Sequence, residues 1–580
     1  MDQKRFQSLK KAVENSRKQL EPFREELEKT LKSYTGPHYG ANRDVGDKPI
    51  NMLELAVTSL LQQLSSRNPQ VVCTTHNPNA ESAAIEMELA VNHALKKMDF
   101  EKEHRLWVLS AIFCVGIMEV GLDVTDSPEI DGEELPITDV FCETIMFDDF
   151  VFDTSAAKWG RQQVAFWGHK YKVSLAEAKR NKSFSKDVRE KLTAAEKQKD
   201  GTGSISTGES GSDEPFTEMC EIWQVFVPET DELVTFSMES DMPLKTVEWK
   251  GPKNGPYHFF GFNPVLNNIM GLPPVANWID LDDLENKLYT KLGIQASRQK
   301  TIGITDNSNL QDAQNIIKTN DGDVLAVGNP NNFKEASFGG VNQQTLGFAL
   351  NVKSMADFVM GNLSAQMGLG ASSPTLGQEE MIKQAANVRI ASMQGVLLSA
   401  TEKVIRDIAF YLHHHPTIEY EMTREITGTD LKVPVKWPRR DDGFGNEVDV
   451  RDGDYDEYEI KIEPYSMTDI SPGQRAQLLR SIWAQDVLPA IPLGVQPDVY
   501  AYLDTLAKYL DLPELRKIVK MTQQAMPPQM MGEGGGVGAP KPGKPNGKYT
   551  RNNVSHGQTP QAHDQQMAQL MMASGGEGEQ

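Results

Sequence analysis

The stretch that decides the fold runs from residue 368 to residue 412 and reads GLGASSPTLGQEEMIKQAANVRIASMQGVLLSATEKVIRDIAFYL. Its first part is rich in glycine and serine, and from Gln378 to Leu412 the pattern is that of one very long helix. At about 1.5 Å per residue, such a helix is about 50 Å long. Compact enzyme domains rarely contain a helix of this length, so the stretch raises the question of a mechanical role.

The loop that precedes this helix is a candidate phosphate-binding site, because free backbone N–H groups at a helix start attract anions. The phosphate-loop pattern GxxxxGK[ST] is not met, since Gly370 is followed by ASSPTLG and no Gly-Lys-Ser or Gly-Lys-Thr occurs. Gly368 and Gly370 lack the third glycine of a dinucleotide-binding fingerprint, and a helix precedes them instead of a strand. We interpret the loop as a flexible connection between helices and expect no cofactor.

Length and charge set the next limits. The 580 residues are enough for three or four compact units at roughly 150 residues each. The formal net charge of −22 argues against a protein that clasps nucleic acid with a basic surface. It does not argue against a protein that lets DNA slide past without holding it.

No membrane span, signal peptide or disulfide framework is predicted. The most apolar stretch, Leu106 to Leu122, is broken by Gly116 and Glu119 and is shorter than the roughly 20 residues that a span needs. The N-terminus MDQKRFQSLKK lacks the apolar segment of a signal peptide, so we expect a cytoplasmic protein. Four cysteines without CxxC spacing are predicted to be buried or free thiols, namely Cys73, Cys114, Cys142 and Cys220.

The N-terminal half is predicted to begin with helices and to continue with strands. Apolar residues at helical spacing predict helices over 5–34, 51–69 and 80–100, followed by the apolar helix EHRLWVLSAIFCVG. Pro22 is expected to kink the first helix or to divide it. Strands are expected in QVVCTT, IMEVGLDV and TDVFCETIMFDDFVFD, with a hairpin formed by EIWQVFV and ELVTFS. Ser174 and Glu177 fit a capping box, and 199–215 is expected to be a flexible insertion.

The C-terminal half alternates between helices and β-rich pieces. Helices are predicted over 273–298 and 343–361, with a glycine- and asparagine-rich segment of brief β-like runs between them. Residues 416–465 are predicted to be β-rich, and two short helices follow, ending near Ala525. From Met526 on, the composition predicts a disordered tail.

The candidate catalytic and metal-binding groups do not combine into a site. His413, His414 and His415 are consecutive, so they cannot all reach one ion from a regular helix. Cys73 and His76 have a ligand-like spacing but no second pair, and the acidic loop 441–459 places Arg451 at a ligand position of the calcium-loop pattern. No GxSxG or HExxH pattern occurs. We therefore expect neither a metal site nor an enzyme.

The order of elements from residue 273 to residue 412 resembles the core of tailed-bacteriophage portal proteins, the head-to-tail connector rings. The helix PPVANWIDLDDLENKLYTKLGIQASR, an α/β insert, the helix LGFALNVKSMADFVMGN, a loop and a very long helix follow one another. NMLELAVTSLLQQLSSRNPQV and AESAAIEMELAVNHALKKMDF look like the opening helices of the family's wing. The strands around FDDFVFDTSAAKWGRQQVAFWGHKYKVSLAEAKR are similar to wing strands, and the resemblance spans roughly residues 1 to 525.

The resemblance implies an α+β portal fold with long stem and wing helices, mixed β elements in wing and clip, and a closed, twelve-fold ring. It also implies a division of the chain and a role for each part, and the size and extended C-terminal region of the chain indicate a short-tailed phage within this family. The parts are an N-terminal wing (1–272), a stem helix (273–298), a clip (299–342), a second stem helix (343–361), a tunnel loop (362–377), the long helix with the rest of the wing (378–465), a helical crown (466–525) and a low-complexity tail (526–580).

Two sets of residues would then face the DNA. Small uncharged residues would give the tunnel loop mobility and weak contacts, where lysine or arginine would bind phosphates and slow translocation. These residues are Gly368, Gly370, Ala371, Ser372, Ser373 and Gly377. The stem carboxylates Asp282, Asp283 and Glu285 would repel DNA from the channel wall; the alternative is that they form the solvated face of an ordinary helix.

The resemblance also implies the partners. A homo-oligomer, a dodecamer in the family, would pass double-stranded DNA non-specifically and would bind the terminase large subunit, tail adaptor proteins, and the major capsid and scaffolding proteins. It would lie at the portal vertex of the virion, and in the host cytoplasm during assembly. ATP hydrolysis would belong to the terminase. Two alternatives remain: another virion structural protein, such as a tail adaptor or internal scaffold, and a metal-dependent nucleic-acid-processing enzyme.

Overall fold

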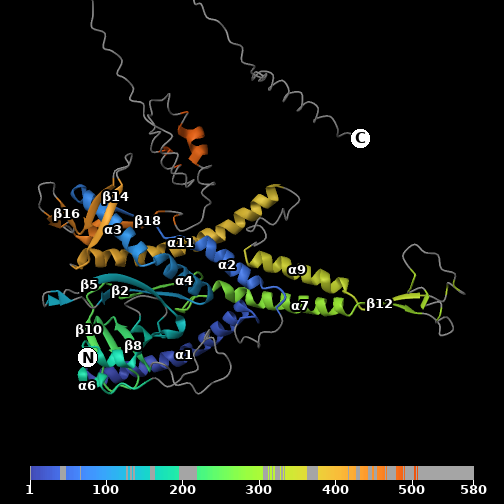
Figure 1. Cartoon of the computed structure of the whole chain (residues 1–580), viewed down its shortest axis with the longest axis horizontal. Helices are drawn as coiled ribbons and strands as arrows, with labels where there is room; N and C mark the ends of the chain where they lie inside the picture. Colours follow the sequence, from blue (N-terminus) through green and yellow to red (C-terminus); the bar gives the residue numbers. More distant parts are fainter. Residues whose placement is uncertain are drawn as a thin grey trace, which may run out of the picture. The chain divides into compact units, whose positions relative to one another are not determined.

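The computed structural model of the chain is a mixed α+β structure (Figure 1). It divides into a unit from Met1 to Lys517 and a second unit from Ile518 to Gln580. The structure describes residues 2–39, 48–65, 67–125, 129–130, 133–134, 137–156, 158, 164–194, 218–304, 311, 314–315, 318–319, 327, 331, 334–361, 376–415, 417–425, 432–441, 447–449, 454–463, 466, 479–487, 489, 502–503 and 506. The predicted insertion 199–215 and the tail 526–580 lie outside these residues.

Four helices open the chain, as the apolar spacing predicts. They are α1 (Gln3–Thr35), α2 (Met52–Leu64), α3 (Glu81–Lys97) and α4 (Phe100–Phe113). Helix α1 runs through Pro22 without interruption, so the expectation that this proline divides the helix is wrong. Leu20, which is buried, and Leu27 pack into the core on either side of the proline, and this packing offsets the lost backbone hydrogen bond.

Two antiparallel sheets form the β-rich part of the N-terminal half. The smaller has the order β11-β2-β5 and the larger the order β10-β9-β8-β7-β6. Their strands are β2 (Gly116–Thr125), β5 (Ile137–Ile145), β6 (Phe150–Phe152), β7 (Trp167–Ser174), β8 (Met219–Val227), β9 (Glu232–Phe236), β10 (Lys245–Glu248) and β11 (Tyr257–Phe260). The predicted hairpin is confirmed as β8 and β9, with Phe226 opposite Leu233.

Alternate side chains of β8 face opposite sides of the larger sheet, as the pleat requires. Trp223 and Val225 pack against α1, whereas Cys220 and Ile222 pack against the short helix α5 (Leu175–Arg180). Helix α5 begins after Ser174, where the capping box predicts a start. The side chain of Ser174 makes no capping hydrogen bond, so the box itself does not form.

The long helix is α11 (Leu376–His414), which has 39 residues and packs through the middle of the largest hydrophobic core. It begins two residues before the predicted start and ends two residues after the predicted end. Its buried side chains include Leu397, Val404, Ile405, Ile408 and Leu412. The helix contacts α2 and α3, and these side chains share one hydrophobic core with residues of α4, so the helix connects the C-terminal half of the chain to its first helices.

The β-rich segment after α11 is also confirmed. It contains β14 (Tyr420–Glu425), β15 (Lys432–Trp437), β16 (Arg439–Asp441), β17 (Glu447–Asp449) and β18 (Tyr458–Ile462). Strand β18 pairs with β1 (Val71–Thr75), the predicted strand QVVCTT, with Val71 opposite Ile462. The remaining short elements are η1 (Pro78–Ala80), β3 (Glu129–Ile130), β4 (Glu133–Glu134), η2 (Phe147–Asp149), α6 (Lys186–Arg189), η6 (Tyr455–Glu457) and the π-helical turn η7 (Trp483–Val487).

The four cysteines are buried and form no disulfide, which confirms their prediction. Burial raises the pKa of Cys73 and of Cys114 to about 12, so both thiols stay protonated at neutral pH. Within the described residues, no helix is both long and apolar enough to cross a membrane.

Candidate functional site

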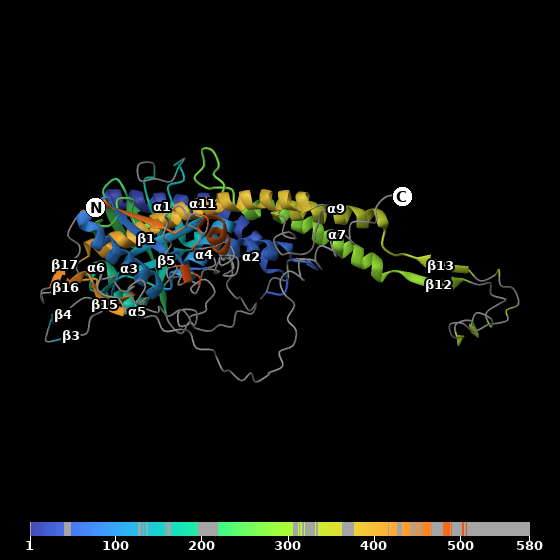
Figure 2. The same cartoon turned by 90° about the horizontal axis from the view of Figure 1, so that it is seen from above.

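The candidate site is a pair of helices joined through two strands. Helix α7 (Ile279–Ser297) follows the turn η3 (Pro274–Asn277) and leads into β12 (Lys300–Ile304); β13 (Lys334–Phe338) leads back into α9 (Gln343–Val359). The strands are antiparallel, with Lys300 opposite Phe338, and the helices lie side by side (Figure 2). The predicted order of helix, insert with β-like runs and returning helix is therefore confirmed.

Helix α9 packs through one narrow stripe. Only Ala349, Val352 and Ala356 are buried within its length, at helical spacings of three and four. Small residues dominate this stripe, so α9 approaches its neighbours closely but buries little apolar area. Asn342 caps the helix by accepting a hydrogen bond from the backbone N–H of Gln344.

The other faces of α9 carry large apolar side chains exposed to solvent. Phe358 is 72% exposed, Met355 60% and Phe348 52%. Further apolar side chains are exposed on α7, on β12, on α9 and on α11, namely Leu284, Ile294, Ile302, Ile304, Leu346, Leu350, Val388 and Val396. A concentration of exposed apolar side chains of this kind is typical of an interaction site.

The N-terminal turn of α7 is held in place by a buried ion pair. Lys48 Nζ lies 2.6 Å from Asp282 Oδ2, and both side chains are almost fully buried. Lys48 also donates to the backbone oxygen and the hydroxyl of Ser33 at 2.7 and 2.6 Å. The other oxygen of Asp282 accepts from the backbone N–H of Leu53, at the start of α2. This cluster joins the end of α1, the start of α2 and α7.

Glu285 lies one turn further along α7 and is also buried, but its environment differs. Neither of its carboxylate oxygens has a hydrogen-bond partner in the described part of the chain. Burial raises the pKa of Glu285, and the neighbouring Asp282 raises it further, while Lys353 of α9 acts in the opposite direction. Asp282 and Glu285 thus occupy the interior between α7 and its neighbours.

These positions correct the predicted acidic channel face. Asp282 and Glu285 do not face solvent, so they form neither an exposed repulsive wall nor the solvated face of an ordinary helix; Asp283 is half-buried. The helical spacing alone could not reveal this, because the partner Lys48 is 234 residues away in the sequence. The exposed charged residues of the two helices are Asp280, Lys287, Lys291 and Lys353, of which three are cationic.

The predicted tunnel-loop residues fall largely outside the described part. Gly368, Gly370, Ala371, Ser372 and Ser373 lie outside it, and Gly377 is the second residue of α11 and not part of the loop. The start of α11 is linked to the helix pair, because Arg389 donates to the backbone oxygen of Val359 at 2.9 Å.

Candidate metal and catalytic groups can be located in the same way. Within the described residues, no group of three or more His, Cys, Asp or Glu side chains could hold a metal ion. Two adjoining cavities of about 540 and 370 Å³ lie along α1 and share Phe23, Asn268 and Met270. Asp153, which lines the larger one, accepts three hydrogen bonds from Ser155 and Ala165. Burial raises the pKa of this carboxyl group, but the three hydrogen bonds together outweigh burial and lower it, so the carboxylate is stabilised by its own loop.

No protein-family model matches this chain, and no curated protein matches it. The functional interpretation therefore depends on the sequence pattern and on the geometry described above.

Proposed function

We propose that the chain is a subunit of a portal ring, the head-to-tail connector at one vertex of a tailed-bacteriophage capsid. Copies of the chain close into a ring, expected to have twelve members, through which double-stranded DNA is packaged and ejected. The helices α7 and α9 are the stem, and the strands β12 and β13 belong to the clip, which docks the terminase large subunit and later the tail adaptors. The subunit itself catalyses no reaction.

The observation that carries this proposal is the apolar surface of α9. A helix that buries only three small residues and exposes Phe348, Met355 and Phe358 is incompletely packed as a single chain. Burying a large apolar side chain contributes about 1.5–3 kcal/mol, so contact with a neighbouring copy would recover a stabilisation that the single chain forgoes. A head-to-tail contact of this kind closes into a ring when the rotation between copies allows it.

The buried carboxylates change how the channel is expected to treat DNA. Because Asp282 and Glu285 are internal, a low-grip channel has to depend on the small tunnel-loop residues Gly368, Gly370, Ala371, Ser372 and Ser373 and not on an acidic stem. The exposed cations Lys287, Lys291 and Lys353 are available for contact with a neighbouring copy or with the DNA backbone.

Negative-stain electron microscopy of the purified full chain, combined with mass photometry, tests the proposal. Closed rings of roughly ten to fourteen copies, with a hole wide enough for duplex DNA, are the expected result. Because assembly on a scaffold is one route to a ring, the same sample is examined with scaffolding protein and with a crowding agent. A chain that stays monomeric or dimeric under all three conditions contradicts the proposal.

The tunnel loop has a separate test. Replacing Ser372 and Ser373 with lysine introduces phosphate-binding cations into the proposed channel, so DNA packaging should slow while rings still form. The matched control is the double replacement with alanine, which should package normally. Unchanged packaging by the lysine variant would argue against a location of this loop in the channel.

A further inference from the structure

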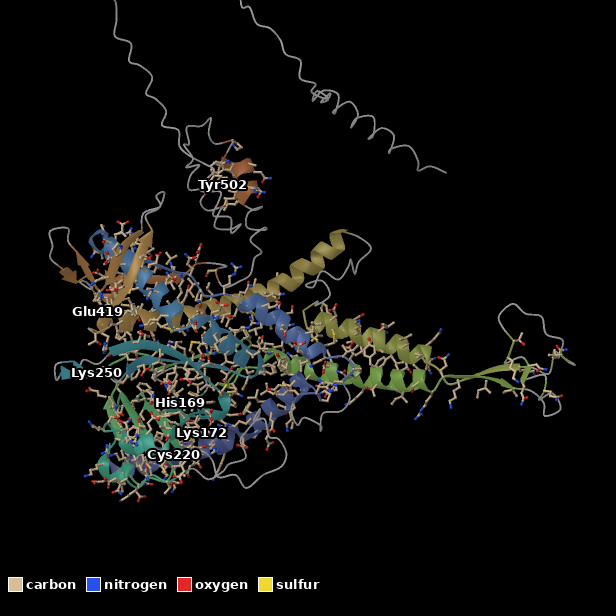
Figure 3. The ribbon with its side chains drawn as sticks, in the orientation of Figure 1. His169, Lys172, Cys220, Lys250, Glu419 and Tyr502 are labelled. Carbon is tan, nitrogen blue, oxygen red and sulfur yellow. The ribbon has the colours of Figure 1, made fainter. Side chains whose placement is uncertain are left out.

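Two cross-strand pairs, one from each sheet of the N-terminal half, meet in the interior. Glu119 of β2 lies opposite Tyr257 of β11 in the smaller sheet, and His169 of β7 lies opposite Gln224 of β8 in the larger one. Glu119, His169 and Tyr257 are buried. His169 lies in the interior of the β-rich part (Figure 3). These four residues therefore form a polar contact between two sheets that are otherwise packed through apolar side chains.

The distances connect the four residues into a closed path. The side-chain amide of Gln224 donates to Glu119 Oε1 at 2.9 Å, and Glu119 Oε2 lies 3.6 Å from His169 Nε2. On the other side of the imidazole, His169 Nδ1 lies 2.7 Å from the hydroxyl of Tyr257. That hydroxyl donates to the backbone oxygen of Gln224 at 3.4 Å.

In one assignment of protons, each donor and each acceptor along this path has a hydrogen-bond partner. The Tyr257 hydroxyl donates to the Gln224 backbone oxygen, so its own oxygen accepts from an N–H at His169 Nδ1. His169 Nε2 is then an acceptor that faces Glu119 Oε2, and only a protonated carboxyl group can donate to it. The path is complete when Glu119 carries a proton, with Oε2 moving a few tenths of an ångström closer.

The electrostatics agree with this assignment. Burial and, to a smaller extent, the charge of Glu143, its partner on β5, together raise the pKa of Glu119 to about 8. Burial lowers the pKa of His169 to about 4. Both groups are therefore neutral at pH 7, so their contact is not an ion pair.

Among the described residues, no permanently charged cationic side chain neighbours Glu119. In the described part of the chain, its ion-pair contact is with His169, and no lysine or arginine lies within ion-pair distance of it. The titratable groups that face this region from the adjacent elements are Glu103 of α4, Cys142 and Glu143 of β5, Tyr171 of β7, Cys220 of β8, His258 of β11, and Asp407 and Tyr411 of α11. Loss of the Glu119 proton would leave a buried negative charge among neutral and acidic groups, which is costly.

We propose that Glu119 is a proton-dependent lock between the two sheets. In the protonated form its carboxyl group, on β2 of the smaller sheet, contacts Gln224 of β8 and His169 of β7 in the larger one, and loss of the proton removes the hydrogen bond to His169. Proton release from the folded state is centred near the pKa of about 8. The stabilisation that the proton provides is complete below the unfolded-state pKa of about 4.3 and is lost progressively as the pH rises from there through about 8, so only its last part is lost above pH 7.

The first experiment compares the wild type with Glu119→Gln, which has the shape of the protonated form and cannot ionise. Between about pH 7 and about pH 9.5, the unfolding equilibrium constant of the wild type, measured in urea, should rise about tenfold from this group, whereas that of Glu119→Gln should lack this rise. The matched control is Glu143→Gln, in the same sheet, which should keep the rise but move it to lower pH, because the charge of Glu143 helps to raise the pKa of Glu119. An identical alkaline rise in the wild type and in Glu119→Gln would overturn the proposal.

A second measurement does not depend on any variant being able to fold. Hydrogen–deuterium exchange of the wild-type chain, corrected for the intrinsic effect of pH, should show at least tenfold weaker protection at about pH 9.5 than at about pH 7 in peptides covering 116–122, 167–174 and 219–227. Peptides from α9 should show no such change. Equal protection of the sheet peptides at the two pH values would overturn the proposal.

Discussion

The two sheets of the N-terminal half and the helix pair α7 and α9 differ in how much of their large apolar side chains they bury. In the sheets, large side chains such as Trp167, Trp223 and Phe226 are almost completely buried. In α9, Phe348, Met355 and Phe358 are more exposed than buried. Both regions are made of similar residue types, so the difference lies in what surrounds them.

This difference separates the part of the chain that folds by itself from the part that is completed by other molecules. The larger sheet is enclosed on one side by α1 and on the other by α5, and the smaller sheet packs against α4 and α11. The helix pair has one buried stripe, and its other faces lack cover in the described chain. The stability of the sheets should therefore be a property of the monomer, and that of the helix pair a property of the assembly.

The largest effect is expected from a truncation in the enclosed part. Trp107 of α4 is fully buried, with its ring centroid 4.4 Å from that of Phe260. Replacing it with alanine should reduce the free energy of unfolding by about 3–5 kcal/mol, because a cavity remains. Phe358→Ala, a comparable truncation on α9, should change it by less than about 0.5 kcal/mol in the monomer. Chemical denaturation measures both, and equal losses would remove the distinction between the two regions.

The junction between the regions should be nearly as sensitive. Removing Lys48 by substitution with methionine leaves the buried carboxylate of Asp282 without its cation, which should cost about 3–5 kcal/mol. The double variant with Asp282→Leu should recover much of that loss, because no buried charge then remains. A double-mutant cycle in urea measures the coupling. Additive losses would show that Lys48 and Asp282 act independently.

Acid should weaken the enclosed part through His104. This residue is fully buried, with Ser65 Oγ 2.7 Å from its Nδ1 and Thr401 Oγ1 3.0 Å from its Nε2, and burial lowers its pKa to about 3. A histidine whose pKa is lowered in the folded state stabilises the fold at pH values above its unfolded-state pKa of about 6.5. This stabilisation is lost as the pH falls from about 6.5 towards about 3, because only the unfolded state then takes up a proton. Between about pH 7 and about pH 4.5, the loss should be on the order of 2–3 kcal/mol. His104→Gln should show a smaller acid loss in urea titrations, and an unchanged loss would exclude His104 as its source.

The helix pair should respond to substitution only when copies associate. The triple variant Phe348→Ser, Met355→Ser and Phe358→Ser should raise the protein concentration required for assembly at least tenfold, because each side chain loses about 1.5–3 kcal/mol of burial. The control changes two exposed apolar residues near the sheet, Met242→Ser and Val247→Ser. Mass photometry follows both over a dilution series. Assembly that is equally weakened in the control would show that the effect is not specific to α9.

The smallest effect is expected from the exposed lysines of α7. Replacing Lys287 and Lys291 with alanine removes two cations without disturbing a buried contact, so the stability should stay within about 0.5 kcal/mol. If these side chains reach DNA in the assembled ring, the slope of the logarithm of the DNA-binding constant against the logarithm of the salt concentration should become shallower, by the equivalent of about two phosphate contacts. Filter binding at several salt concentrations measures the slope. An unchanged slope assigns these lysines to contacts between subunits.

The success and failure of sequence-based prediction follow the range of the interactions. The hairpin of β8 and β9, the strand β1 and the long helix α11 were predictable, because their side-chain spacing is a local property. The continuity of α1 through Pro22 was not, because tertiary packing on both sides decides it. The pairing of β1 with β18 and the burial of Asp282 by Lys48 join residues hundreds of positions apart, and no local pattern encodes them.

The same reasoning explains which parts of the candidate site the sequence could supply. The order of α7, β12, β13 and α9 followed from periodicity and from composition. The side of each helix that faces inward did not, because α7 carries apolar and acidic residues on overlapping faces, and Glu285 is buried without a hydrogen-bond partner. The exposed face of α9 is visible only once the structure shows that its stripe of small residues is the buried one.

A three-dimensional reconstruction of the assembled wild-type protein by electron cryomicroscopy tests the central claim most directly. The account predicts a closed ring in which Phe348, Met355 and Phe358 of α9 are buried against a neighbouring copy, while the two sheets of each copy keep the packing described here. An assembly in which these three side chains remain exposed, or one without an open channel between the helix pairs, would contradict it.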